Sequence, residues 1–204
     1  MKKNNKGFSL IELSIVLIIM GLLIAGVTGG ASLIKSAQLR SIVTEFTNYR
    51  TAFNTYYAQF GKVPGASDTD GNVIDTAEGA VGALSTLFSE GIIDREPTDG
   101  AVASKFGKGA KWYLTNAGDS YVASDFSNLN VLILSGSEDF AAQVLTNREA
   151  QSIDEKVDDG KSGTGLVRGV QKTAEGGNAA MGSDYNEDTI KTAKEWGFVS
   201  KMDF

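Results

Sequence analysis

Residues 7–13 read Gly-Phe-Ser-Leu-Ile-Glu-Leu, between a leader with Lys2, Lys3 and Lys6 and an apolar run to Val27. Glu12 is the one charge in a segment that otherwise favours lipid, where a carboxylate costs roughly 2.5–3.5 kcal/mol. We therefore expect Glu12 to have a partner. A cut between Gly7 and Phe8 would create one, because the new α-amine of Phe8 is a cation that can neutralise the carboxylate within one subunit or across two.

The combination of basic leader, Gly7, Phe8, Glu12 and apolar run resembles the class III signal of type IV prepilins and type II secretion pseudopilins. The resemblance covers about the first 30 residues. It implies that a membrane-embedded prepilin peptidase cleaves after Gly7 and methylates the new amine of Phe8. It also implies that Glu12 is the carboxylate that sets register when subunits assemble into a helical filament.

Two other interpretations of the N-terminus remain open. An ordinary secretory signal peptide would have the same basic start and apolar centre, with cleavage near Ala31. A signal anchor would stay uncleaved. Glu12 falls inside the apolar centre, where a secretory signal tolerates charge poorly, and a helix-compatible pattern continues past Ala31. Both observations favour the prepilin interpretation.

Composition excludes several classes of function. The 204 residues contain 19 Lys plus Arg against 25 Asp plus Glu, and removing the leader (residues 1–7) lowers the basic count to 16. Nucleic acid is therefore not expected as a general partner, since phosphate binding relies on Lys and Arg. The chain contains neither Cys nor His. It therefore lacks disulfides, thiol nucleophiles and the commonest general base, and we expect neither an enzyme nor a resident cofactor.

Large residues recur at alternating steps of three and four beyond the apolar run, which predicts one stripe of an amphipathic helix. The stripe comprises Leu39, Ile42, Phe46, Tyr49, Phe53, Tyr56 and Phe60. The residues between, including Glu45, suit a solvated face. We expect one helix over about 8–60, with residues 8–34 as a transmembrane and assembly half and residues 35–204 as a globular head.

Gly26, Gly29 and Gly30 lie where this helix would leave the membrane. Each glycine lowers helix propensity by about 1 kcal/mol relative to alanine. They predict a flexible point, although small residues that allow close helix contacts explain them equally well.

The head is expected to be α+β and pilin-like, with a small antiparallel sheet and a loop-rich connection over 61–110. Short runs predict a helix at 79–89, a hairpin of 111–115 with 120–123, and strands at 130–134 and 165–170. Thr146 and Glu149 match a capping box for a helix that ends at Asp158-Asp159-Gly160. A last helix is expected near 187–196. Segments 53–65 and 150–165 also resemble pilin-like proteins, although the cysteine pair of many relatives is missing.

Two groups of acidic or amide side chains are candidate calcium ligands, because calcium binds clusters of oxygen atoms. The first group is Asp68, Asp70 and Asn72, and the second is Asp154, Asp158 and Asp159. The sequence favours a solvated acidic loop for the first group. For the second it favours a turn, in which Asp154 caps the helix or pairs with Lys156 or Arg148.

Lys105, Lys108 and Lys111 alternate with Phe106, Trp112 and Tyr113, a pattern that suits single-stranded DNA. The competing interpretation places these aromatic residues in a core strand.

The prepilin resemblance implies partners and a location. The partners are other pilin subunits, the prepilin peptidase, an inner-membrane assembly platform and the lipid bilayer. The location is the bacterial inner membrane, with one span and a periplasmic head, and then a cell-surface pilus or a periplasmic pseudopilus. A minor tip subunit that takes part in adhesion or DNA uptake is an alternative, and a secreted soluble protein is a second one.

Overall fold

The structure is a computed structural model that describes residues 8–66, 71–74, 79–116, 129–137, 142, 144–171, 180–181 and 197–202. The chain divides into two compact units, Met1–Gln38 and Leu39–Phe204. Helix α1 (Leu10–Phe60) contributes residues to both. The predicted helix over 8–60 is therefore confirmed to within two residues of its start.

In the second unit α1 buries one stripe of side chains, as its three-four periodicity predicts. The stripe enters a single hydrophobic cluster with residues of the sheet, among them Trp112, Leu114 and Leu132. Two expectations were wrong. Phe60 is 44% exposed because the helix ends there, and Glu45 is only 5% exposed although we placed it on the solvated face.

Gly61 ends α1 as a left-handed cap. Its φ is +68°, a conformation that glycine adopts without steric cost, and its N–H donates to the Tyr57 carbonyl at 2.8 Å. The helix stop predicted at this glycine is confirmed.

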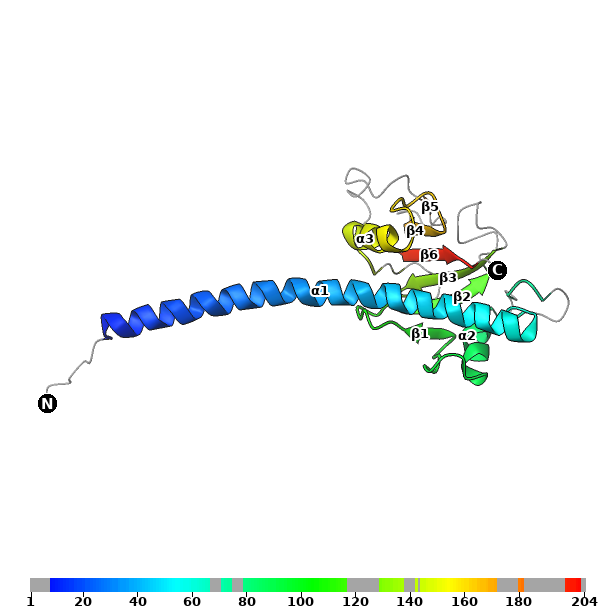
Figure 1. Cartoon of the computed structure of the whole chain (residues 1–204), viewed down its shortest axis with the longest axis horizontal. Helices are drawn as coiled ribbons and strands as arrows, with labels where there is room; N and C mark the ends of the chain where they lie inside the picture. Colours follow the sequence, from blue (N-terminus) through cyan, green and yellow to red (C-terminus); the bar gives the residue numbers. More distant parts are fainter. Residues whose placement is uncertain are drawn as a thin grey trace. The chain divides into compact units, whose positions relative to one another are not determined.

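The described residues of the head form two further helices and six strands (Figure 1). The helices are α2 (Gly79–Ser89) and α3 (Asn147–Val157). The strands are β1 (Ala101–Ala103), β2 (Lys111–Asn116), β3 (Asn130–Ser135), β4 (Val167–Gln171), β5 (Ala180–Met181) and β6 (Gly197–Lys201). Every pair of neighbouring strands is antiparallel, in the order β1-β2-β3-β6-β4-β5. The α+β layout with a small antiparallel sheet is confirmed.

The sheet corrects the predicted hairpin. β2 pairs along its whole length with β3, from Lys111 opposite Ser135 to Asn116 opposite Asn130. On its other side it pairs with β1, a strand too short to show a period-two pattern in the sequence. The expected strand at 120–123 and the expected helix at 187–196 lie outside the described residues. β5 and β6 were not anticipated.

Other elements agree with their sequence signals. Helix α2 has the predicted bounds, and β3 is buried at every position. Helix α3 begins with the predicted capping box: the Thr146 N–H donates to Glu149 Oε2 at 2.8 Å, and the Glu149 N–H donates to Thr146 Oγ1 at 3.4 Å. These reciprocal bonds satisfy backbone donors that have no partner within the helix.

Candidate functional site

The N-terminal part of α1 presents its apolar side chains to the surroundings. Phe8 is 90% exposed and Leu10 is 89% exposed, and most large side chains as far as Ile34 are more than half exposed. An 18-residue window within α1 has a mean hydropathy of 2.7 with none of its residues buried. By length and composition this helix can cross a membrane. Because a soluble domain rarely leaves so large an apolar area uncovered, the surface requires lipid or other protein around it.

Glu12 has a hydrogen-bond partner at the start of its own helix. The Ser9 backbone N–H donates to Glu12 Oε2 at 2.8 Å, and the Ile11 N–H donates to Ser9 Oγ at 3.3 Å. Ser9 therefore caps the helix through the Ile11 N–H, and the Glu12 carboxylate accepts from the cap residue while it lies near the positive end of the helix dipole. Gly7 lies outside the described residues, so the pairing of Glu12 with a free amine on Phe8 stays a prediction.

Gly26, Gly29 and Gly30 lie inside α1, which is helical throughout this region. A methyl group added at any of the three would meet nothing within 4 Å. The described part of the chain therefore does not need these glycines for its own packing, and their use as a flexible point or a close helix contact stays a prediction.

Glu45 is a buried carboxylate that joins helix α1 to the rest of the head through hydrogen bonds. The sequence interpretation missed this role. Its Oε2 accepts hydrogen bonds from Ser104 Oγ at 2.6 Å and from Trp112 Nε1 at 2.9 Å. Its Oε1 accepts from the Lys105 backbone N–H at 2.9 Å and from Arg95 Nη1 at 3.3 Å. A buried carboxylate is stable only when such donors replace water. Glu45 thus fastens α1 to β2 and to the segment before it.

The sequence did contain a signal for this role. Glu45 stands three residues after Ile42 and four before Tyr49, so it shares the buried helical face with them. The side chain of Tyr49 packs beside Trp112, with ring centroids 5.8 Å apart. Burial, and next the charge of Glu45, raise the pKa of Tyr49 well above its usual range, so this phenol stays neutral.

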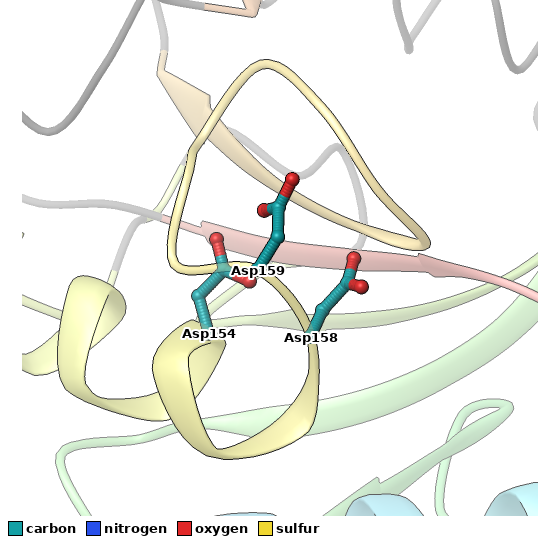
Figure 2. A group of neighbouring side chains, drawn as sticks. All are labelled: Asp154, Asp158 and Asp159. Atoms are coloured by element: carbon teal, nitrogen blue, oxygen red, sulfur yellow. The ribbon is translucent and has the colours of Figure 1, made fainter.

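Asp154, Asp158 and Asp159 do come together, as Figure 2 shows at the end of α3. One carboxylate oxygen from each lies within 4.8 Å of the other two. Asp154 is fully buried and Asp159 is exposed. This donor set suits a hard cation such as calcium, because it offers only oxygen ligands.

Hydrogen bonds already occupy much of this cluster. Asp158 Oδ2 accepts from the Val167 N–H at 3.1 Å and also from the Leu166 N–H. The bond from the Thr164 hydroxyl, and next the bond from the Lys161 N–H, lower the pKa of Asp159. The cluster therefore organises the turn that leads into β4, and calcium binding stays a prediction.

The first calcium group lies mostly outside the described residues, which exclude Asp68 and Asp70. Asn72 is described, and its backbone carbonyl accepts a hydrogen bond from Asn130 Nδ2 at 2.8 Å. Asn130 Oδ1 accepts from the Ile74 N–H at 2.9 Å. The side chain of Asn130 thus holds the segment 71–74 against β3.

The three candidate lysines have different surroundings. Lys108 Nζ lies 3.4 Å from Glu149 Oε2 and 4.9 Å from the centre of the Phe106 ring. Its charge is therefore paired with a residue of its own head. Lys105 and Lys111 form no ion pair with the residues that the structure describes. The rings of Phe106, Trp112 and Tyr113 are at most 2% exposed. They offer little surface on which a nucleic-acid base could stack.

Comparison with known proteins identifies the N-terminal segment. Residues 2–28 match the family model of the prokaryotic N-terminal methylation motif. The match includes Gly7, Phe8 and Glu12, and it confirms the resemblance to type IV prepilins at the segment that suggested it. The match covers the N-terminal segment and does not extend into the head.

Among solved structures, the chain is similar to the major type IV pilin PilA1 from Clostridium difficile. The sequence identity is 18%, the match covers 83% of this chain and 96% of that chain, and the TM-score is 0.46. No curated protein sequence matches this chain.

Proposed function

We propose that this chain is a structural subunit of a helical filament, either a type IV pilus or a type II secretion pseudopilus. The observation that carries the proposal is the exposed apolar helix from Leu10 to Ile34, most of which lies within a methylation motif over residues 2–28. In the precursor this helix spans the bilayer as a single anchor, with the head on the periplasmic side. In the filament, packed helices of neighbouring subunits replace the lipid around it.

The sequence of steps follows from the motif. The prepilin peptidase removes residues 1–7 and methylates Phe8, and the assembly platform then moves the subunit into the polymer. Residues 8–34 serve as the assembly half and residues 35–204 as the head. Such a polymer is heterologous and does not close, so the same two surfaces repeat along its axis.

Glu12 serves this process in two ways. Before assembly, the hydrogen bond from the Ser9 N–H holds the carboxylate at the start of the helix. During assembly, the amine of Phe8 on a neighbouring subunit offers a stronger, charged partner, and the pairing sets the axial register of the helices. A subunit out of register would leave both charges unpaired in an apolar environment.

The variant Glu12→Ala tests this role. Cells that produce it should cleave the leader and hold the subunit in the membrane, while the yield of sheared filaments falls by about tenfold or more, since an unpaired buried charge costs several kcal/mol. Ser9→Ala is the matched control, because it removes the capping hydroxyl and keeps the carboxylate. Assembly of Glu12→Ala at the wild-type yield would refute the role.

A further inference from the structure

An open hollow of about 480 Å³ lies beside β1, at one edge of the sheet. Arg95, Lys105 and Lys111 contribute cations to its lining and Glu96 contributes the one anion. We call these three cations the basic edge. A net positive surface is notable on a chain whose formal net charge is −6. Electrostatic complementarity therefore favours a partner with an acidic surface at this hollow.

The hydrogen bonds of Glu45 hold the basic edge in place. Glu45 accepts the Lys105 backbone N–H and one N–H of Arg95, and Arg95 Nη1 also donates to the Ala103 carbonyl at 2.6 Å. Arg95 is thus largely engaged within the head. Lys105 and Lys111, which form no ion pair with described residues, supply the attraction. A fixed backbone beneath them lowers the entropy cost of docking.

A complementary surface lies near the other edge of the same sheet. Within residues 154–159, Glu155 and Asp159 are exposed beside Lys156, and we call these two carboxylates the acidic turn. Asp154 is fully buried, and Asp158 accepts backbone hydrogen bonds within the head. Asp158 anchors the turn to β4 through the Val167 N–H, and β2, β3 and β6 separate β4 from β1 in the strand order. Opposite charges near opposite edges are the arrangement that a heterologous, repeating contact between copies requires.

We propose that the basic edge of one subunit docks on the acidic turn of a second copy of this chain. The inference rests on the proposed function and names the partner surface of the head within the filament. The buried rings of Phe106, Trp112 and Tyr113 favour this partner over single-stranded nucleic acid, because the lysines have no exposed aromatic surface beside them.

A charge swap tests the pairing in the full chain. Lys105→Glu and Glu155→Lys, made separately, should each lower the salt resistance of sheared filaments, with an effect on yield of about two- to fivefold as expected for an exposed ion pair. The double variant should recover the wild-type yield, because the pair is re-formed with its signs exchanged. Lys108→Ala is the matched control: it removes a charge from the same loop that is already paired with Glu149, and it should leave the yield unchanged.

Cross-linking gives an independent readout, since the chain has no cysteine of its own. Filaments of a Lys105→Cys, Glu155→Cys variant treated with a short bis-maleimide should give a ladder of covalent multimers. A Gln59→Cys, Glu155→Cys variant, with its first cysteine on an exposed position of α1, should not.

Each outcome decides the inference. The ladder together with recovery in the charge swap supports it. Normal filaments without the ladder overturn it and leave the filament function standing. A wild-type chain that forms no filament refutes the proposed function, and the inference falls with it. Binding of a single-stranded oligonucleotide that Lys105→Glu abolishes, without a ladder, overturns it in favour of nucleic acid.

Discussion

Helix α1 carries two glutamates in opposite surroundings, one in each unit of the chain. Glu45 is 5% exposed and accepts four hydrogen bonds from Ser104, Trp112, Lys105 and Arg95. Glu12 lies among exposed apolar side chains and, among the residues that the structure describes, accepts one hydrogen bond, from the Ser9 N–H. One carboxylate is satisfied within its own subunit, while the other still has capacity for a partner outside it. The difference separates a residue that holds the fold from a residue available for assembly.

The same contrast runs along the whole helix. From Leu39 to Tyr56 the large side chains of its stripe are buried in the head's own core, whereas from Leu10 to Ile34 the large side chains are exposed. One continuous helix thus has a buried half and an exposed apolar half. Matched substitutions in the two halves should therefore affect different properties, stability in one and filament assembly in the other.

The largest effect is expected for Glu45→Ala. It leaves the indole N–H of Trp112 and the Lys105 N–H without an acceptor in a buried site, so the free energy of unfolding should fall by about 3–5 kcal/mol. Denaturant unfolding of the full chain in detergent, followed by tryptophan fluorescence, measures the change. Glu12→Ala should leave the unfolding midpoint of the head unchanged. Equal stability of the two variants would show that Glu45 does not hold the head together.

A matched pair of isoleucines sharpens the comparison. Ile42 is fully buried and Ile18 is 70% exposed. Ile42→Ala should lower the free energy of unfolding by about 2–4 kcal/mol, because it removes apolar contacts and leaves a cavity. Ile18→Ala should not destabilise the head, and should lower filament yield instead. If both variants lowered stability alike, the exposed half of α1 would have a partner inside its own subunit.

The smallest effect is expected for two glycines, and with opposite signs. Gly165 has a φ of +79°, and a methyl group there would collide with the Asp158 carboxylate. Gly165→Ala should therefore cost about 1–2 kcal/mol. Gly29→Ala meets open space in a regular helix, and should raise helicity in detergent, since alanine gains about 1 kcal/mol in helix propensity. Circular dichroism with thermal unfolding distinguishes the two variants. A loss of helicity or stability in Gly29→Ala would contradict the placement of Gly29 in a regular helix with open space around it.

Local signals predicted the elements that depend on local physics. The three-four stripe predicted α1, the Thr146–Glu149 capping box predicted the start of α3, and the continuous apolar run predicted the buried strand β3. The methylation motif was likewise visible, because its charges and apolar run are contiguous in the sequence.

Elements that depend on distant partners were missed. β1 has three residues and β6 lies far along the chain from β3, with which it pairs, so neither carries a pattern of its own. Glu45 was placed on the solvated face because its charge outweighed its position between Ile42 and Tyr49. Its donors Ser104 and Trp112 come from about 60 residues away, as the separations of 59 and 67 show, and only the folded chain brings them together.

The central claim is that this chain is processed after Gly7 and then assembled through its exposed helix. Mass spectrometry of the mature protein, recovered from sheared or purified filaments, tests it most directly. The account predicts a chain that starts at Phe8, with its α-amine methylated, and that is depleted from filaments when Glu12 is replaced by alanine. A mature chain that retains Met1, or that begins near Ala31, would contradict it.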